Sequence, residues 1–133
     1  MTEGPQEICE AWKGVLGLMR SGREFLSDEN NWCQRHARHP DGHRRSILGA
    51  VGNILSEAES PWTRAATQLL AIAVGKGDGP YDGGWVQHFN DTHTHAEVLA
   101  LMDRTIAAAE REAAIAARGP RAWRVVADRW VLI

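Results

Sequence analysis

The chain has 133 residues, of which 44% are apolar and 24% are charged, and its formal net charge is −2. This length and composition indicate one soluble globular domain with a sizeable core. A net charge this close to zero argues against a protein whose whole surface is adapted to nucleic acid or to a membrane.

The N-terminal sequence and the cysteines favour the cytoplasm. No basic stretch followed by an apolar run opens the chain, so we expect no signal peptide, and no apolar run is long enough to cross a bilayer. Cys9 and Cys33 make no disulfide framework in a chain of this length, and we expect both to be reduced thiols. The predicted location is cytoplasmic, without a membrane partner.

The first predicted element is a helix over residues 5–26. Pro5 is a typical first helical residue, and apolar residues recur on one helical stripe: Ile8, Trp12, Val15, Met19 and Leu26. Gly14, Gly17 and Gly22 each weaken this helix by about 1 kcal/mol relative to alanine. They are spaced so that another helix could approach closely. The polar stretch that follows shows no periodicity and has a turn signal at Asp41-Gly42.

Two shorter helices and a glycine-rich loop come next. Ser46 is a predicted cap for a helix from residue 47 to about residue 58, and Ser60-Pro61 begins a helix over 61–74 that Gly75 ends. Residues 75–84, GKGDGPYDGG, predict neither a helix nor a central strand. Residues 85–89 fit either an extended segment or a turn.

The strongest local signal is a long helix at about residues 95–118. Thr94 and Glu97 form a capping box, and Gly119-Pro120 stops the helix. One face repeats at helical spacing: Val98, Leu101, Met102, Thr105, Ile106, Ala109 and Ala113. The tail, residues 121–133, fits a helix or a strand. The sequence therefore predicts one compact all-α domain over 1–133, a bundle of four or five helices around the long one, with a tail of uncertain type.

A cysteine and three histidines form the pattern C-x2-H-x2-H-x3-H, namely Cys33, His36, His39 and His43. Thiolate and imidazole are ligands that zinc prefers. The spacing fits no common zinc module and lacks a second pair of ligands, although His88, His93 and His95 could contribute from elsewhere. Solvated histidines in an arginine-rich loop are the favoured interpretation, so we predict no metal and no cofactor.

Cys33 beside a histidine could also be a nucleophile with its base, and Arg35 and Arg38 would lower a thiol pKa. No oxyanion-hole motif and no orienting group accompany it. A buried thiol beside Trp32 is the favoured interpretation, and we lean towards a protein that is not an enzyme.

Asn90 and Asp91, followed by His93 and His95, lie just before the N-terminus of the long helix, which is a natural anion site. The structural interpretation is favoured: Asn90 and Asp91 make a turn, and Thr94 caps the helix. We predict no catalytic residue here.

Two basic segments stand out from an acidic body, because residues 31–45 and 118–133 each carry four arginines and one aspartate. Arginine and tryptophan are frequent in protein–protein hot spots, and they also contact phosphates and stack on bases. The predicted partner-binding residues are Trp32, Arg35, Arg38, Arg121, Trp123, Arg124 and Trp130. Another protein is the favoured partner. A second copy of the chain, packed on the alanine-rich residues 107–117, is an alternative, and nucleic acid is less favoured.

Three blocks read together carry a family resemblance: FLSDENNWCQRHARHPDGHRRSILGAV, the alanine-rich helix after it, and FNDTHTHAEVLALMDRTIAAA. They resemble a family of small uncharacterised proteins from bacteria, largely actinobacteria, and from their phages. The matching positions are Trp32, Gly42, Gly49, Ala50, Asn90, Asp91, Thr94, Glu97, Val98, Leu99, Asp103 and Arg104. The family often has a cysteine where Ser46 or a neighbour stands here.

No activity is established for that family, so the resemblance implies a phage or mobile-element context and no mechanism. We therefore expect a non-enzymatic protein-interaction factor, for example a phage accessory protein that binds a host or defence protein. The alternatives are a metal- or thiol-dependent enzyme centred on Cys33 and the histidines, and a small nucleic-acid binder that uses the Arg/Trp patches.

Overall fold

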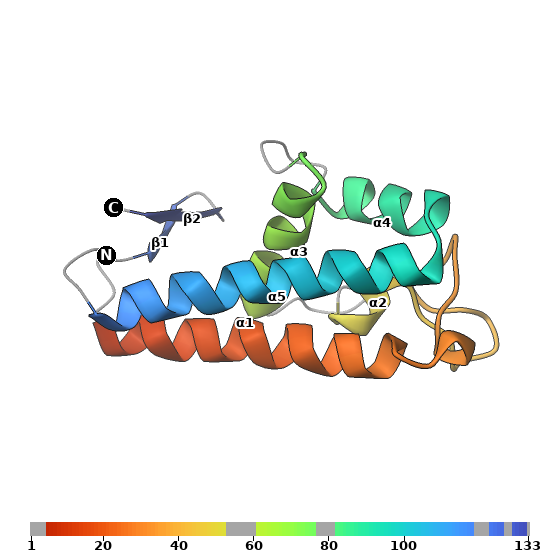
Figure 1. Ribbon diagram of the computed structural model, residues 1–133, viewed down its shortest axis with the longest axis horizontal. Helices are drawn as coiled ribbons and strands as arrows, with labels where there is room; N and C mark the ends of the chain where they lie inside the picture. Colours follow the sequence, from red (N-terminus) through yellow and green to blue (C-terminus); the bar gives the residue numbers. More distant parts are fainter. Residues whose placement is uncertain (1–4, 53–60, 77–81, 119–122, 127–128, 133) are drawn as a thin grey trace.

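The computed structural model describes residues 5–52, 61–76, 82–118, 123–126 and 129–132 (Figure 1). Within them lie five α-helices: α1 (Pro5–Leu26), α2 (Ile47–Ala50), α3 (Pro61–Ala73), α4 (Asp82–Thr92) and α5 (His95–Arg118). A short 3-10 helix, η1 (Glu29–Asn31), follows α1. The strands β1 (Trp123–Val126) and β2 (Arg129–Leu132) form an antiparallel ribbon in which Trp123 is opposite Leu132 and Val125 is opposite Trp130.

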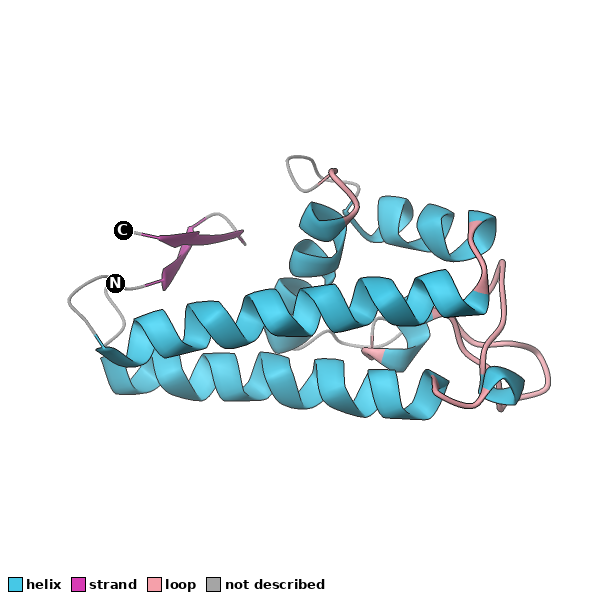
Figure 2. Cartoon of the chain, in the orientation of Figure 1, coloured by secondary structure: helices cyan, strands magenta, loops and turns pink. Residues whose placement is uncertain are grey.

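The helices α1 and α5 run side by side along the length of the molecule (Figure 2). α3 packs on both of them, and α4 packs on α3 and α2. Two ion pairs join the long helices: Arg23 Nε lies 2.7 Å from Asp103 Oδ1, and Arg20 Nη2 lies 3.3 Å from Glu110 Oε2. The two helices are antiparallel, because the later residue of α1 pairs with the earlier residue of α5. The predicted helical bundle around the long helix is confirmed.

The core lies where α1, α3 and α5 meet. Its largest side chains with no exposed surface are Met19, Leu26, Ile47, Leu70, Leu101 and Met102. The predicted apolar face of α5 is confirmed, because its residues are buried or half-buried as far as Ala113. The capping box also forms: Glu97 donates its amide to Thr94 Oγ1 at 3.2 Å, and Glu97 Oε1 accepts from the Thr94 amide at 2.9 Å.

Two of the three α1 glycines allow a close approach. A Cβ on Gly14 would lie 2.3 Å from the Trp62 ring of α3, and one on Gly22 would lie 3.0 Å from the Ala50 carbonyl oxygen of α2. A Cβ on Gly17 would meet nothing within 4 Å. The expected close contact is thus found at the first and third glycine and not at the second.

The second predicted helix is too long. α2 ends at Ala50, because Gly52 adopts a positive φ of 84° and breaks the helical path. Residues 53–60, through which the predicted helix continued, lie outside the described residues. Ser46 makes no side-chain cap hydrogen bond, since its hydroxyl donates instead to Gln87 Oε1 at 2.9 Å. The predicted third helix is correct to within a residue, and Gly75 ends it with a φ of 85°.

The segment 82–92 corrects a further prediction. It forms the helix α4, although residues 82–84 were expected to be non-helical and residues 85–89 to be extended or turned. Gly83 and Gly84 each disfavour a helix by about 1 kcal/mol. Burial of Val86 and Asn90, four residues apart and both without exposed surface, outweighs that cost. In the described part of the chain, no helix is both long and apolar enough to cross a membrane.

Candidate protein-interaction site

Residues 32–45, here called the arginine loop, connect η1 to α2 and have a defined backbone. The Cys33 amide donates to the Arg45 carbonyl at 3.0 Å, and the Arg45 amide donates to the Asn31 carbonyl at 2.8 Å. At the far end, the His39 amide donates to the Arg44 carbonyl at 2.8 Å, and Gly42 turns the chain with a φ of 77°. The loop therefore closes on itself like an irregular hairpin.

The side chain of Asn90, in α4, anchors the start of this loop. Asn90 has no exposed surface. Its Oδ1 accepts from the indole nitrogen of Trp32 at 2.8 Å and from the amide of Ile47 at 3.2 Å. Its Nδ2 donates to the Cys33 carbonyl at 3.0 Å. One buried amide therefore joins α4 to the start of the arginine loop and to the first residue of α2. These bonds satisfy groups that would otherwise be costly to bury.

The neighbouring carboxylate of Asp91 fixes the backbone of Arg35. Asp91 Oδ1 accepts from the Arg35 amide at 2.6 Å and from Gln87 Nε2 at 2.8 Å. Arg35 has a φ of 73°, and it is the only described residue other than glycine with a positive φ. Such a conformation costs a non-glycine residue about 1 kcal/mol or more. A charge-assisted bond to the amide offsets part of that cost.

Two further contacts hold the loop against the helices. Gln34 Nε2 donates to the carbonyls of Asn90 and His93, at 3.2 Å in each case. The Ala37 carbonyl accepts from the Ser46 amide at 3.1 Å and lies so close to Gly49 that a Cβ there would come within 1.9 Å of its oxygen. The loop is thus seated on both α4 and α2.

The four arginines of the loop differ in their surroundings. Arg44 Nε donates to Asp41 Oδ2 at 2.8 Å, and the guanidinium of Arg45 lies 5.5 Å from the centre of the Phe25 ring. Arg35 and Arg38 are exposed, and neither side chain forms a hydrogen bond or an ion pair with the described residues. Two guanidinium groups therefore point to solvent from a fixed backbone.

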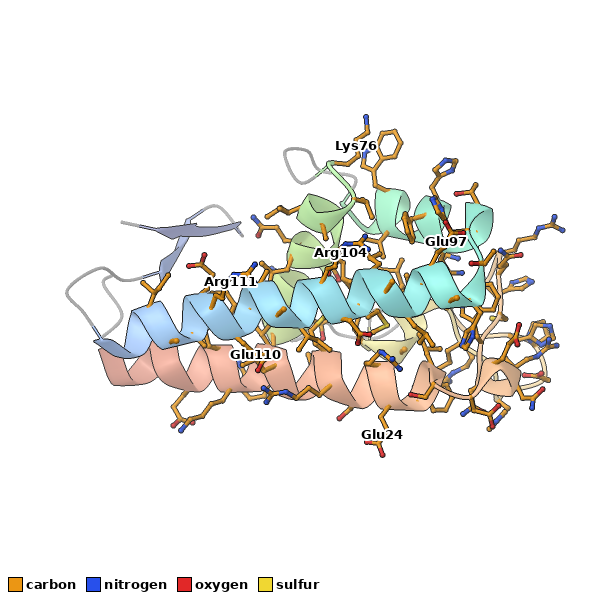
Figure 3. All side chains as sticks on the ribbon, in the orientation of Figure 1. Glu24, Lys76, Glu97, Arg104, Glu110 and Arg111 are labelled. Atoms are coloured by element: carbon orange, nitrogen blue, oxygen red, sulfur yellow. The ribbon has the colours of Figure 1, made fainter. Side chains whose placement is uncertain are left out.

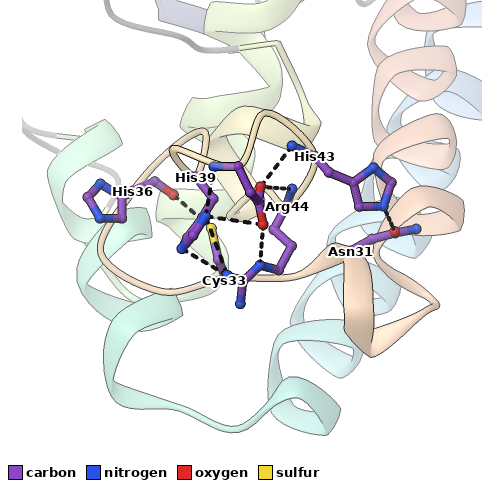
Figure 4. A network of polar contacts seen from close by, with 7 residues as sticks. Asn31, Cys33, His36, His39, His43 and Arg44 are labelled. Carbon is purple, nitrogen blue, oxygen red and sulfur yellow. Dashed lines mark hydrogen bonds and ion pairs between the residues drawn. The ribbon is translucent and has the colours of Figure 1, made fainter.

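The cysteine and the histidines of the loop do not converge on one point (Figure 4). The Cys33 thiol is 6% exposed and donates to the His36 carbonyl at 3.4 Å. His36 and His39 meet edge to face with ring centres 5.8 Å apart, whereas His43 Nε2 lies 2.5 Å from Asn31 Oδ1 on the other side of the loop. In the described ranges, no three His, Cys, Asp or Glu side chains are grouped to hold a metal ion.

Electrostatics keeps the Cys33 thiol protonated and the Asp41 carboxyl ionised. Burial raises the pKa of Cys33 above its ordinary value, and this effect exceeds the opposing effect of Arg44. The backbone amide of His43 and the Arg44 side chain lower the pKa of Asp41 well below its usual range. Cys33 is therefore a buried thiol, as favoured from the sequence, and its raised pKa disfavours the thiolate form.

The predicted turn at Asn90 and Asp91 is wrong, because both residues lie in the last turns of α4. His93 stacks on Phe89 with ring centres 3.6 Å apart. His95 Nε2 lies 2.6 Å from the Leu26 carbonyl at the end of α1, and its ring centre is 5.5 Å from that of Trp32. These polar groups join the ends of α1, α4 and α5.

The other predicted contact residues fall into two groups. Trp32 is half-buried and bound to Asn90, so it holds the loop in place and is not a freely exposed contact. Arg121 lies outside the described residues, and Trp123, Arg124 and Trp130 belong to the ribbon strands.

Sequence reasoning missed two features of this surface. No local sequence pattern predicts the roles of Gln34 and Gln87, because their partners are distant in the chain. Gln34 donates to the Asn90 carbonyl, and Gln87 accepts from the Ser46 hydroxyl. Trp85 of α4 is 41% exposed, and the Lys76 ammonium lies 4.9 Å from its ring centre (Figure 3). This cation–π contact between Lys76 and Trp85 was not predicted, because residues 75–84 were expected to form a loop and residues 85–89 an extended segment or a turn.

Comparison with known families gives a match over residues 13–108 to a family described as "Family of unknown function (DUF6197)". The matched segment contains the arginine loop, Asn90 and Asp91, and it ends before the ribbon. Comparison with curated proteins and with solved structures gave no significant match. Since the match covers well over half of the chain, the protein belongs to the DUF6197 family, a family of unknown function.

Proposed function

We propose that this protein is a non-enzymatic interaction factor that binds another protein through Arg35 and Arg38. The observation that supports this most is the pairing of a strained, fixed backbone at Arg35 with an unpaired, exposed guanidinium. Backbone strain that the surrounding structure maintains is typical of functional sites. A backbone that is already fixed at Arg35 loses less conformational entropy on binding than a mobile loop would, which favours recognition.

The surroundings of the loop favour binding over catalysis. Cys33, the one described thiol of this region, is buried and its pKa is raised, so it is unsuited to attack a substrate. The polar side chains beneath the loop, Asn90, Asp91 and Gln87, are engaged with one another and with backbone groups. They support the loop and present no free acid or base.

We further propose that Arg121 and the ribbon residues Trp123, Arg124 and Trp130 contact the same partner or a second one. The context that we propose is the bacterial cytoplasm, with the protein acting as a phage or mobile-element accessory factor on a host or defence protein. This rests on the sequence resemblance alone. A second copy of the chain, packed at the alanine-rich end of α5, is the alternative partner, and the molar mass in solution distinguishes it.

The test is quantitative affinity capture with the tagged full chain. Arg35→Ala/Arg38→Ala is compared with Arg104→Ala/Arg111→Ala, a control that removes the same charge from exposed positions of α5 (Figure 3). A parallel variant, Trp123→Ala/Arg124→Ala, tests the ribbon. The proposal expects one reproducible protein partner that is lost with the loop variant and kept with the α5 control. Equal capture by the loop variant and the wild type would contradict it.

A further inference from the structure

The arginine loop has more positive than negative side chains, and the excess positive charge is exposed at two arginines. Its one acidic residue, Asp41, accepts from the amides of His43 and Arg44 and from the Arg44 side chain. Arg45 is half-buried beside Phe25. Arg35, Arg38 and Arg45 all lack a carboxylate partner among the described residues, and of these three only Arg35 and Arg38 are exposed.

We infer that Arg35 and Arg38 bind an acidic peptide segment of the partner, an extended one with carboxylates two residues apart. This inference rests on the proposed function and adds the chemistry of the ligand. The Cα atoms of Arg35 and Arg38 are three residues apart, so they lie within roughly 10 Å of each other. Carboxylates two residues apart lie on the same face of an extended segment and are about 7 Å apart, which is within that limit. Arginine matches a carboxylate with two parallel hydrogen bonds, which adds geometric selectivity to charge attraction.

The same charge balance argues against a nucleic-acid ligand. Tight phosphate-backbone binding generally uses about 6–10 contacts, whereas two arginines would neutralise two phosphates. Asp28, which caps η1, and Glu29, its first residue, are both exposed and precede the loop, and the chain as a whole has a net charge of −2. A long polyanion would meet these carboxylates, while a short peptide needs to meet only the two guanidinium groups.

Asp91 acts on this surface as a positioning residue. Its carboxylate holds the Arg35 amide at 2.6 Å and so maintains the positive φ that directs the arginine. Electrostatics alone predicts that removing a carboxylate beside a basic surface strengthens the binding of an acidic peptide. Positioning predicts the opposite. The variant Asp91→Ala therefore separates the two effects.

The experiment measures fluorescence anisotropy of a labelled peptide in which glutamate alternates with serine. The same peptide with glutamine in place of glutamate is the neutral control, and a labelled single-stranded oligonucleotide of equal charge is the polyanion control. Titrations use the full chain at an ionic strength of about 0.15 M, where screening over roughly 8 Å suppresses nonspecific attraction. Circular dichroism checks that every variant remains folded.

The inference predicts that the glutamate peptide binds, that Arg35→Ala/Arg38→Ala weakens binding about tenfold, and that Arg104→Ala/Arg111→Ala changes it less than about twofold. Asp91→Ala is expected to weaken binding about threefold despite the lost negative charge. The inference is overturned if the neutral peptide binds equally well, if the loop variant binds unchanged, or if the oligonucleotide binds more tightly. If the glutamate peptide does not bind while capture of a protein still depends on Arg35 and Arg38, the inference of an acidic peptide ligand is wrong and the proposed function stands.

Discussion

The indole nitrogen of Trp32 donates a 2.8 Å hydrogen bond to the side-chain oxygen of Asn90, across 58 residues of chain. This contact ties the arginine loop to the end of α4, and the amide of Ile47 shares the same acceptor. The start of the loop is therefore tied to the helices by buried hydrogen bonds. The buried side-chain amide of Asn90 thereby helps to position the backbone from which the exposed arginines extend.

Asn90→Ala is expected to destabilise the fold by about 3 kcal/mol, since it leaves the Trp32 indole and the Ile47 amide without their acceptor in a buried site. Urea unfolding monitored by circular dichroism measures this change. Asn30→Ala is the matched control, because Asn30 is exposed and is bonded through its backbone amide. The control should stay within about 0.5 kcal/mol of the wild type. Equal stability of the two variants would show that the Asn90 bonds are not maintained in solution.

Arg35→Gly is expected to stabilise the fold by about 0.5–1 kcal/mol, because glycine adopts a φ of 73° without the steric cost that arginine bears. The same change removes a proposed contact, so it should weaken partner binding. Parallel urea unfolding and peptide titration measure both effects. A loss of stability would mean that the Arg35 side chain supports the fold.

Gly49→Ala and Gly17→Ala are expected to change stability in opposite directions. At Gly49 a Cβ would overlap the Ala37 carbonyl oxygen, so displacing the loop should cost about 1–3 kcal/mol. At Gly17 a Cβ would meet nothing within 4 Å, so alanine should stabilise α1 by about 0.5–1 kcal/mol. Thermal unfolding measures both changes. A tolerated alanine at Gly49 would argue against the close seating of the loop on α2.

Cys33 is expected to react slowly with iodoacetamide at about pH 8, because burial raises its pKa and keeps it a thiol while free cysteine is partly ionised. Peptide mapping after timed alkylation, with and without urea, measures the rate at Cys33 separately from Cys9. A rate in the native protein equal to that in urea would contradict this assignment.

The direction of the Cys33 pKa shift also fixes a pH dependence of stability. The folded state binds the thiol proton more tightly than the unfolded state does. The contribution of this proton to the free energy of unfolding is therefore fully present below the pKa of the unfolded state. It is lost as the pH rises through the folded pKa. Stability should therefore fall in alkaline solution, and Cys33→Ala should reduce the slope of that fall.

The parts of the fold predicted correctly from the sequence depend on short-range signals. The capping box of Thr94 and Glu97, the apolar face of α5 and the glycine stop after α3 involve residues within a few positions of one another. α4 was missed because Gly83 and Gly84 are poor helix formers. Its stability comes from burial of Val86 and Asn90 against distant segments, which no local pattern reports.

The sequence predicts which residues belong to the candidate site, but it does not predict how they contact one another. Arg35 and Arg38 were identified from charge and type, and they are exposed as a contact requires. Asn90 and Asp91 were noticed as a polar pair but assigned to a turn. Their role depends on hydrogen bonds to residues 56–58 positions earlier, whose proximity only the folded chain establishes. The same applies to the positive φ of Arg35, since arginine carries no preference for it.

The most direct test of this account is the hydrogen-exchange rate of the Arg35 amide, measured by NMR in the wild type and in Asp91→Ala. Because the Asp91 carboxylate fixes Arg35 through that amide, we expect strong protection in the wild type and near-complete loss of protection in the variant. The amide of Val98, in the core helix α5, should remain protected in both. An Arg35 amide that exchanges in the wild type as fast as in an unstructured peptide would contradict the account.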